Sequence, residues 1–325
     1  MKTLLTVLMG MGLAVAAVGA QSTPIVIAHR GASGHRPEHT IASYRLAVEM
    51  GADFIEPDLV STKDGVLIAR HENDIGGTTD VADRFPDRRR TTTIDGQVVS
   101  GWFTEDFTLA EIKSLRAKER LPFRSHAHDG QFQVPTFDEV LDLAATLGRE
   151  RGRPVGVYPE TKHPTYFRGI GLPLEEKLVA ALEAHGLNRK DAPVFIQSFE
   201  TENLRALRAR TPVRLIQLIG NPAMLAGESL SAIARYADGV GPEKSMVQPV
   251  APDGSLLPPT DVVARAHDAG LLVHIWTIRV DTEFLPASYR GDGAAEFRRF
   301  RELGVDGMFT DFPDVGVRAL RGGTP

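Results

Sequence analysis

The sequence predicts an α/β protein built on a (β/α)8 barrel, the TIM barrel, and three observations support this class. Strand-like and helix-like segments alternate from Thr136 to the end of the chain, which is typical of parallel α/β folds. Nine strand-like segments are present, enough for eight barrel strands and one additional hairpin arm. No linker-like or low-complexity stretch divides the 325 residues, so we expect one domain with an insertion.

The composition excludes some classes of function. Hydrophobic residues make up 42% and charged residues 24% of the chain, an ordinary globular balance at a length that buries a sizeable core. The formal net charge is −5, so the sequence offers no basic character for binding nucleic acid. After the N-terminal segment no apolar stretch is long enough to cross a bilayer, and we expect no stable membrane insertion.

Residues 1–20 have the features of a cleaved secretory signal peptide. They carry one lysine, an apolar run, and the small residues Val18, Gly19 and Ala20. A membrane anchor is the alternative, but the apolar run is short for a span and no charged residue stops it. The chain has no cysteine, so neither lipid attachment nor disulfides are expected. We therefore expect a mature domain over residues 21–325, in the bacterial periplasm or secreted.

The first strand and helix can be placed from local signals. Residues 25–29 are a short apolar run ended by a polar, glycine-rich segment, the pattern of a buried strand that leads into a loop. Thr40 is a suitable N-cap for a helix over residues 41–50. Gly51 follows as the left-handed residue that ends this helix.

The next two strands form a predicted hairpin. They cover residues 53–59 and 66–70, with a Lys-Asp-Gly turn between them. A connection this short cannot cross over between parallel strands, so the pair must be antiparallel. The hairpin is expected to bring Glu56 and Asp58 close to His71.

Residues 72–134 break the regular pattern and are predicted to be an insertion or a cover over a site. One helix is expected there, over residues 109–117, opened by a capping box of Thr108 and Glu111. The three consecutive arginines at residues 88–90 suit an anionic substrate. Solvated charges at a loop edge are the commoner case and our expectation.

Regular alternation returns with a helix over residues 136–147, opened by a second capping box of Thr136 and Glu139. We expect six further strands, at residues 155–160, 194–199, 214–219, 239–241, 271–277 and 308–311. We expect four further helices, near residues 174–185, 201–208, 260–269 and 294–303.

Polar residues gather at the predicted carboxyl ends of the strands. Barrels of this class carry their active sites at that face, so these residues are the candidates for function. They are His29, Arg30, Glu56, Asp58, His71, Glu160, Lys162, His274 and Trp276.

Three of the candidates are carboxylates. Glu56 and Asp58 are two residues apart, so both side chains point to the same face of an extended strand. Glu160 joins them from another strand. Neighbouring buried carboxylates repel each other unless a cation bridges them, and an all-oxygen ligand set suits Ca²⁺ or Mg²⁺. Pairing with Arg30 and Lys162 is the alternative, but it leaves a crowded acidic site, so we predict a metal site.

His29 and His71 suit a general base and a general acid, because imidazole works in both forms near neutral pH. Arg30 and Lys162 supply positive charge beside them. The sequence contains no Ser or Cys nucleophile elbow and no nucleotide-binding glycine loop. These residues together predict cleavage of a phosphate ester.

The remaining histidines are given no catalytic role. His35 and His39 lie in a polar loop and suit helix-entry or surface positions. The others lack comparable neighbours and are expected at the surface; they are His126, His128, His163, His185 and His267.

A set of motifs spans the chain in a fixed order. They are HRGASGHRPEHT, EPDL, a DG turn followed by His71, TDVADRFPDR, YPETK, SFE, YADGVGP and GMFTDFPD. With these motifs the chain resembles bacterial periplasmic glycerophosphodiester phosphodiesterases, the GDPD family. The resemblance runs over nearly all of residues 21–325.

The resemblance implies a distorted TIM barrel with a family-specific insertion after the early hairpin. It implies hydrolysis of deacylated phospholipids, such as glycerophosphocholine or glycerophosphoethanolamine, to sn-glycerol 3-phosphate and an alcohol, with Ca²⁺ as the usual metal. It assigns roles to eight residues: acid and base to His29 and His71, phosphate contacts to Arg30 and Lys162, metal binding to Glu56, Asp58 and Glu160, and pocket lining to Trp276. We take His29 as the base and His71 as the acid; the nucleophile is either water or the glycerol 2-hydroxyl.

Three other classes of function share features with this sequence. A phospholipase C or D that acts on intact lipid shares the barrel and paired histidines, but the insertion here is polar and bears arginines instead of an apolar rim. A glycoside hydrolase uses two carboxylates and does not need two histidines and an arginine beside them. A non-catalytic binding protein has no use for a general acid. We therefore expect a small-molecule glycerophosphodiester as the substrate.

Overall fold

The computed structural model describes residues 23–322, so the predicted signal peptide at residues 1–20 lies outside the described residues. The main sheet holds eleven strands. Ten of them are parallel and form the barrel, with bounds β1 (Ile25–His29), β2 (Phe54–Glu56), β3 (Asp58–Ser61), β7 (Gly156–Val157), β8 (Glu160–Thr161), β9 (Phe195–Ser198), β10 (Arg214–Ile219), β11 (Gly239–Pro242), β12 (Leu272–Ile278) and β13 (Gly307–Thr310). The eleventh, β4 (Leu67–Ala69), runs antiparallel to β3, which confirms the predicted hairpin.

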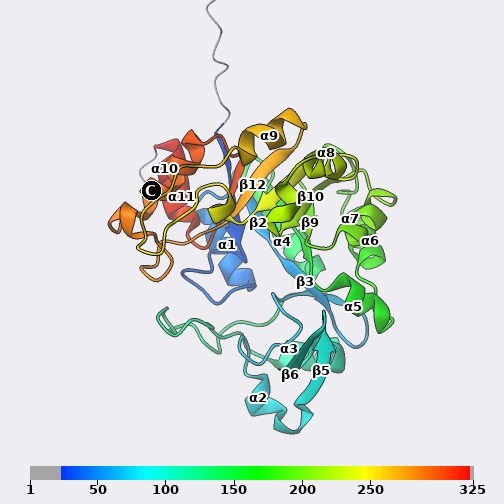
Figure 1. The fold of residues 1–325 in the computed structure, drawn as a ribbon. Coiled ribbons are helices and arrows are strands. Elements are labelled where there is room, and N and C mark those ends of the chain that lie inside the picture. The colour runs from blue at the N-terminus through cyan, green and yellow to red at the C-terminus, as the bar shows by residue number, and fades with distance from the viewer. Residues whose placement is uncertain (1–22, 323–325) are drawn as a thin grey trace, which may run out of the picture.

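The parallel strands close into a ring with eight positions, because β2 with β3 and β7 with β8 each occupy one position in two pieces. β1 pairs with β13 on one side and with β2 on the other. A bridge between Val157 and Val194 and the pairing of β8 with β9 complete the circle. The predicted (β/α)8 barrel is therefore confirmed (Figure 1).

Two prolines distort the barrel at neighbouring positions. Pro57 separates β2 from β3, and Pro159 separates β7 from β8. A proline has no N–H to donate to the ladder, so each interrupts a strand that the sequence predicts as continuous. Both carbonyls still accept: Pro57 from the N–H of Glu160 and Pro159 from the N–H of Gln197. The interruption lies at the height of the predicted carboxylates.

The barrel interior is filled by side chains and separates the site from the amino-terminal end of the strands. Alternate strand residues point inward, and the inward apolar residues form one compact cluster. Its members are Ile27, Phe54, Tyr158, Phe195, Ile216 and Phe309. The outward residues, such as Val26 and Ala28, belong to a larger cluster buried beneath the helices. The polar candidates therefore rest on an apolar floor.

The helices largely follow the sequence predictions. The bounds are α1 (Ile41–Glu49), α4 (Phe137–Arg151), α5 (Pro164–Gly169), α6 (Glu175–Ala184), α7 (Thr201–Arg208), α8 (Ser229–Ile233), α9 (Val262–Asp268), α10 (Gly293–Glu302) and α11 (Pro313–Arg321). Short 3-10 helices lie at η1 (Pro86–Arg88), η2 (Thr104–Asp106), η3 (Pro222–Leu225), η4 (Lys244–Met246) and η5 (Ala287–Tyr289). The Thr40 cap, the left-handed Gly51 (φ +97°) and both capping boxes are present as predicted. The helices α5, α8 and α11 were not predicted.

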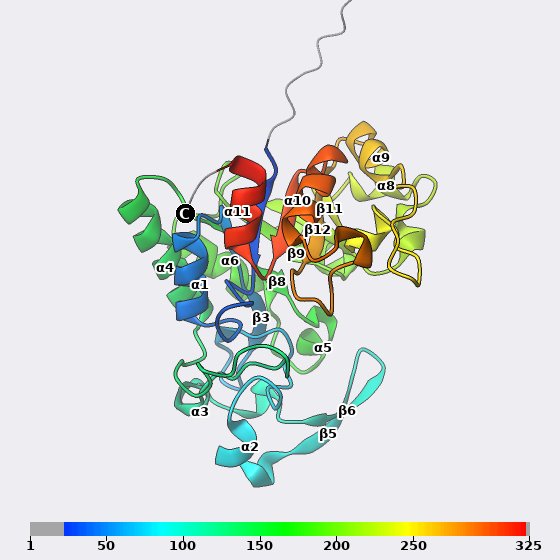
Figure 2. The same cartoon turned by 90° about the vertical axis from the view of Figure 1, so that its left-hand side faces the viewer.

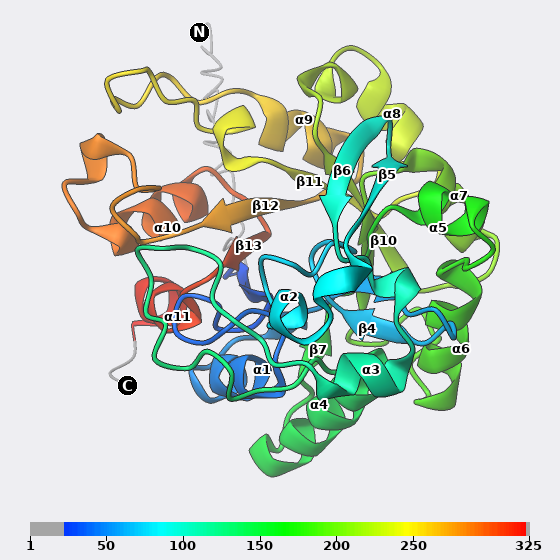
Figure 3. The ribbon, with the colours of Figure 1, turned by 90° about the horizontal axis from the view of Figure 1, so that it is seen from below.

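Residues 72–134 cover the carboxyl ends of the barrel strands, and we call this segment the cap. It contains α2 (Val81–Arg84), α3 (Leu109–Ser114) and a separate antiparallel hairpin of β5 (Arg90–Ile94) and β6 (Gln97–Gly101). Figures 1 and 3 show the cap, in cyan, lying across one end of the barrel. Arg124 of the cap bonds Asp311 directly after β13, which fixes that end as the carboxyl end.

The cap differs from its prediction in several respects. The short helix α2 was not predicted, and α3 ends at Ser114 instead of residue 117. The hairpin was not predicted, although Asp95-Gly96 is a hairpin turn signal and both residues have positive φ (48° and 79°). Two of the three arginines at residues 88–90 are not solvated loop charges: Arg88 bonds Glu111, and Arg90 begins β5 and bonds Glu105 and Asp106. Arg89 is exposed, as expected. Charged groups inside the cap therefore hold its own parts together.

Within residues 23–322, no helix combines the length and apolar character needed to span a membrane.

Candidate active site

The predicted residues meet at the carboxyl ends of the strands, beneath the cap. A cavity of about 120 Å³ lies there. Seven of the eight residues assigned by the resemblance line it; they are His29, Arg30, Glu56, His71, Glu160, Lys162 and Trp276. The eighth, Asp58, lies beside it at the start of β3. Gln197, Phe199, Arg279 and Phe309 are further lining residues.

The three carboxylates form one buried cluster. One oxygen from each of Glu56, Asp58 and Glu160 lies within 4.8 Å of the other two. Burial and the charge of Asp58 raise the pKa of Glu56 well above its ordinary value. Burial likewise raises the pKa of Glu160 to about 8. Mutual repulsion in a buried place is the cause, and a divalent cation would relieve it.

The hydrogen bonding of Asp58 is a second reason to expect that the cluster binds a cation. Asp58 Oδ1 is buried and has no hydrogen-bond partner among the described residues, while Asp58 Oδ2 accepts from His39 Nε2 at 2.9 Å. Burial disfavours the Asp58 charge, but His39 outweighs it and holds the pKa of Asp58 well below its ordinary value. An ionised carboxylate with an unused buried oxygen is a suitable ligand for a hard cation.

His29 is held by a carboxylate from the last strand of the barrel. Its Nδ1 lies 2.6 Å from Asp311 Oδ1. Asp311 Oδ2 accepts from Arg124 Nη2 at 2.7 Å and from Arg279 Nε at 2.8 Å, so this carboxylate is ionised. Burial and Arg30 lower the pKa of His29 to about 3. The ring is therefore neutral near pH 7, with its proton on Nδ1 and a free lone pair on Nε2.

His71 is held in a similar manner by its neighbour in the chain. Its Nδ1 lies 3.0 Å from Glu72 Oε1, and Lys162 Nζ donates to its Nε2 at 3.4 Å. Burial, Arg30 and Lys162 lower the pKa of His71 to about 4. Two histidines thus face one cavity, each oriented by a carboxylate at Nδ1.

Two buried cations complete the polar part of the site. Arg30 has a left-handed backbone (φ 60°), donates its N–H to Glu56 Oε2 at 2.7 Å and its Nη1 to Glu38 Oε2 at 3.0 Å. Lys162 Nζ lies 3.0 Å from Glu160 Oε1. Burial opposes both charges, but the neighbouring carboxylates outweigh it and raise the pKa of each cation. Both are therefore charged and line the cavity.

Trp276 and Phe199 form an apolar wall. Their rings meet edge to face at a centroid distance of 5.7 Å, and Trp276 Nε1 donates to the carbonyl of Gly241 at 2.7 Å. The fixed indole leaves an apolar surface for the carbon skeleton of a substrate.

His274, which its strand position also selected, does not reach the cavity. It is 1% exposed, and its Nδ1 lies 2.8 Å from the hydroxyl of Tyr158 inside the barrel. His274 and Trp276 point to the same face of β12, but His274 is two residues earlier and one layer deeper. Its place at the site was a wrong prediction.

Several residues that support the site were not predicted from the sequence. His39 is fully buried between Asp58 and Tyr44, and is neither a surface nor a merely helix-entry residue. Asp311 was part of a quoted motif but received no role. His163 is not a simple surface group either, because it bonds Glu72 and Asp95. Asp311 could have been predicted, because it lies at the carboxyl end of the last strand, where barrels of this class carry their active sites.

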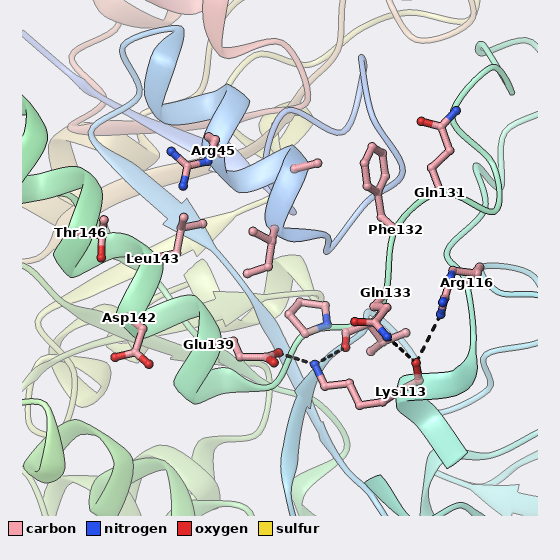
Figure 4. Close-up of a pocket in the computed structure, with 14 residues that line it drawn as sticks. Arg45, Lys113, Arg116, Gln131, Phe132, Gln133, Glu139, Asp142, Leu143 and Thr146 are labelled. Atoms are coloured by element: carbon pink, nitrogen blue, oxygen red, sulfur yellow. Dashed lines mark hydrogen bonds and ion pairs between the residues drawn. The ribbon is translucent and has the colours of Figure 1, made fainter. Parts of the chain in front are cut away.

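A larger cavity, of about 940 Å³, lies away from these residues (Figure 4). It is bordered by α1, α4 and residues 131–135. Lys113 there is bound by Glu139 and the Val134 carbonyl, and Arg116 bonds carbonyls at the end of α3. With these charges internally paired, this cavity lacks the convergent reactive groups of the strand-end site.

The strand-end site offers positive charge, proton-transfer groups and a place for a divalent cation, and it has no Ser or Cys nucleophile among its lining residues. This combination suits attack on a phosphate ester by a small nucleophile. The fold and the site thus define a barrel phosphoesterase.

Comparison with known proteins identifies the family. The chain belongs to the glycerophosphoryl diester phosphodiesterase family, whose profile matches residues 29–315. Glycerophosphodiester phosphodiesterase GDPD6 of Arabidopsis thaliana is 39% identical over 318 residues, which cover 90% of this chain and 84% of that protein. The glycerophosphodiester phosphodiesterase of Haemophilus influenzae is 31% identical, over 93% of this chain and 91% of that protein.

Solved structures share the fold. A glycerophosphodiester phosphodiesterase from Agrobacterium tumefaciens superimposes with a TM-score of 0.60 at 22% identity, over 90% of this chain and 98% of that one. A phosphodiesterase from Oleispira antarctica, solved in complex with the product sn-glycerol-3-phosphate, gives 0.63 at 21% identity, over 91% and 96%. The family match leaves the glycoside hydrolase and the non-catalytic binding protein without support.

Proposed function

We propose that this protein hydrolyses glycerophosphodiesters, the deacylated phospholipids, to sn-glycerol 3-phosphate and an alcohol such as choline or ethanolamine. The observation that carries the proposal is the meeting of three carboxylates, two histidines and two cations around one small cavity. The family membership and the named product in the Oleispira antarctica relative support the same substrate class.

Substrate binding follows from the charges and the wall of the cavity. Arg30 and Lys162 attract the phosphodiester anion, and the guanidinium fork offers two parallel donors to its oxygens. Trp276 and Phe199 pack against the glycerol carbons. Burial of these groups strengthens their attraction for the phosphate, because little water screens it.

Glu56, Asp58 and Glu160 are the residues that would hold a divalent metal, and we propose Ca²⁺. All three donors are carboxylates, the ligand type of hard cations; Mg²⁺ uses the same donors in a stricter octahedral geometry. When bound, such an ion neutralises the negative charge that develops on the phosphate oxygens.

His29 acts as the general base. Asp311 holds the proton on Nδ1, so the lone pair of Nε2 is free to take a proton from the nucleophile. The nucleophile is either water or the glycerol 2-hydroxyl, which would give a cyclic phosphate first. The low pKa of His29, about 3, keeps the ring neutral and ready over the whole neutral range.

His71 acts as the general acid for the leaving alkoxide. A bound phosphodiester anion offsets the charges of Arg30 and Lys162, which lower the pKa of His71 in the free enzyme, so substrate binding favours its protonation. His71 also borders a second cavity of about 680 Å³ between barrel and cap. The departing alcohol has room on that side.

The test is release of glycerol 3-phosphate from glycerophosphocholine with Ca²⁺, with EDTA, and with EDTA followed by excess Ca²⁺. We expect activity that EDTA removes and Ca²⁺ restores. Activity indifferent to EDTA contradicts the metal proposal and leaves the substrate class. If folded protein releases nothing, or cleaves phospholipid vesicles faster than glycerophosphocholine, the proposed substrate class is wrong.

We also propose that residues 1–20 are removed on export and that the mature bacterial domain, residues 21–325, works in the periplasm or outside the cell. The single lysine, the apolar run and the small residues up to Ala20 support this. N-terminal sequencing of the exported protein should begin at Gln21. Recovery of the full chain from the cytoplasm would contradict it.

A further inference from the structure

The carboxylate that orients His71 is itself held by a second histidine. Glu72 Oε2 lies 2.7 Å from His163 Nε2. His163 Nδ1 in turn lies 2.6 Å from Asp95 Oδ2. Four side chains thus form one continuous row of hydrogen bonds from the site to the cap: His71, Glu72, His163 and Asp95.

The row joins two segments that are far apart in the sequence. Asp95 is the first turn residue of the β5–β6 hairpin, and His163 directly follows Lys162 and precedes α5. Figure 2 shows the tip of this hairpin turned up toward α5. Within residues 90–101, Asp95 is the residue whose side chain bonds outside the cap.

The backbone conformations of Asp95 and His163 suit the contact between their side chains. Asp95 and His163 have left-handed conformations, with φ of 48° and 47°. The hairpin turn accounts for this conformation of Asp95, whereas for His163 it is costly and persists where the surroundings hold it. The left-handed turn aims Asp95 at His163, and the left-handed His163 places its ring between two carboxylates.

Charge favours the arrangement as well. Burial works against a charged ring, but the hydrogen bonds to Glu72 and Asp95 outweigh it and raise the pKa of His163. Burial also works against the charge of Glu72, but the hydrogen bonds from His163 and His71 outweigh it and hold the pKa of Glu72 below its ordinary value. A cation between two carboxylates keeps Glu72 ionised and facing His71.

We propose that Glu72, His163 and Asp95 form a latch through which the hairpin tip positions the ring of His71 for protonation of the leaving group. Glu72 fixes the Nδ1 side of the ring, so Nε2 stays at the cavity that Lys162 also lines. The three latch residues and His71 together border the cavity of about 680 Å³ where the leaving alcohol has room. They are positioning residues that act through His71, and the inference rests on the proposed function.

Other contacts hold the rest of the cap, so opening the latch should not unfold it. Arg124 bonds Asp311 and Asp281, and Arg120 bonds Glu38. These contacts do not pass through the hairpin. A loss of activity in a latch variant can therefore be separated from a loss of fold.

The test uses His163→Asn and Asp95→Asn in the full mature chain, with two substrates. One is glycerophosphocholine, whose alkoxide leaving group needs an acid; the other is the p-nitrophenyl ester of glycerol 3-phosphate, whose leaving group does not. We expect kcat for glycerophosphocholine to fall about 10-fold or more, with KM within about twofold, because misplacing a catalytic group has effects of this size. On the nitrophenyl ester the loss should shrink to about twofold or less.

The matched control is His126→Asn. His126 pairs through Nδ1 with a carboxylate, Asp129 Oδ2, at 2.9 Å, but on an exposed part of the cap. This variant should match the wild type on both substrates. The double variant of Asp95 and His163 should be no worse than His163→Asn alone, because both act through one row.

Three results would overturn the proposal: unchanged kcat in His163→Asn, an equal loss on both substrates, or additive losses in the double variant. Circular dichroism and thermal unfolding of each variant show whether the fold is kept. Failure of the proposed function looks different, because the wild type itself would then not cleave glycerophosphocholine.

Discussion

The two histidines of the site are supported by different regions of the molecule. The carboxylate of His29 is Asp311, a buried group at the end of a barrel strand, held by two arginines. The carboxylate of His71 is Glu72, a partly exposed group held by His163 and, beyond it, by the hairpin tip of the cap. The same Nδ1 contact is thus built once on the rigid barrel and once across the border between barrel and cap.

The two histidines of one site are therefore oriented by contacts of different local stability. Orientation of His29 is coupled to the stability of the barrel, because Asp311 is buried at a strand end and is held by Arg279 after β12 as well as by Arg124 of the cap. Orientation of His71 depends on a half-exposed row that can open locally while the barrel stays folded. Perturbing the hairpin tip, and not the Arg124 part of the cap, should therefore affect leaving-group protonation and spare the base.

Replacing the two histidines themselves should have the largest effect on activity. His29→Ala and His71→Ala should each lower kcat for glycerophosphocholine by about 10²- to 10⁴-fold, the range for a general acid or base. The p-nitrophenyl ester should rescue His71→Ala and not His29→Ala. Steady-state kinetics on the two substrates measures this. Retained activity of His71→Ala on glycerophosphocholine would sink the acid assignment.

The second prediction compares the two carboxylates. Asp311→Asn leaves Arg124 and Arg279 without their shared buried charge, so we expect a loss of about 3–5 kcal/mol in unfolding free energy. Glu72→Gln, at a half-exposed pair, should cost about 1 kcal/mol or less. Urea unfolding of both variants measures the two losses. Equal losses in unfolding free energy would show that Asp311 and Glu72 contribute equally to the stability of the fold.

The third prediction uses pH, where the free energy of unfolding should respond with opposite signs to a histidine inside the barrel and to the latch histidine. Burial lowers the pKa of His274, inside the barrel, from 6.5 to about 4. A lowered pKa means that the neutral ring stabilises the fold above pH 6.5 and that this stability is lost as pH falls through 4. For His274 alone the loss is about 3 kcal/mol. His29 and His71, whose pKa values are also lowered, add losses of the same sign.

His163 in the latch has a raised pKa, so its contribution is present below pH 6.5 and is lost as pH rises through the raised value. Unfolding free energy measured from pH 4 to pH 9 tests both signs. The acid loss should persist in His163→Asn, and only the alkaline loss should vanish. If the loss of unfolding free energy at low pH also vanishes in His163→Asn, that loss comes from the latch and not from the barrel.

The smallest effect concerns the carboxylate cluster, which lies between the two regions. Ca²⁺ at about 100 times its dissociation constant should stabilise the protein by about 2.7 kcal/mol. Glu160→Gln should remove most of this stabilisation while the metal-free variant stays folded. Thermal unfolding with and without Ca²⁺ reads this directly. Equal stabilisation of wild type and variant would show that the ion binds elsewhere.

Much of the fold was predictable, because its signals are local. The bounds of α7 and β10 agree with the prediction residue for residue, and the two capping boxes are formed as expected. The β5–β6 hairpin was missed because residues 90–93 are all polar and the adjacent Val98 and Val99 give no alternation, which left Asp95-Gly96 as the only signal. β2 and β7 end early because Pro57 and Pro159 cannot donate to the ladder.

Which residues meet at the site could be predicted from the sequence, since parallel strands present their carboxyl ends at one face and the strand ends carry the polar residues. The side chains that orient these residues follow only from the three-dimensional fold. Asp311 reaches His29 across 282 residues, and Asp95 reaches His163 across 68. Such partners depend on how the ring of strands closes and where the cap folds back, and no local pattern of the chain encodes either. The same holds for His39 and His274, whose burial follows from packing on all sides.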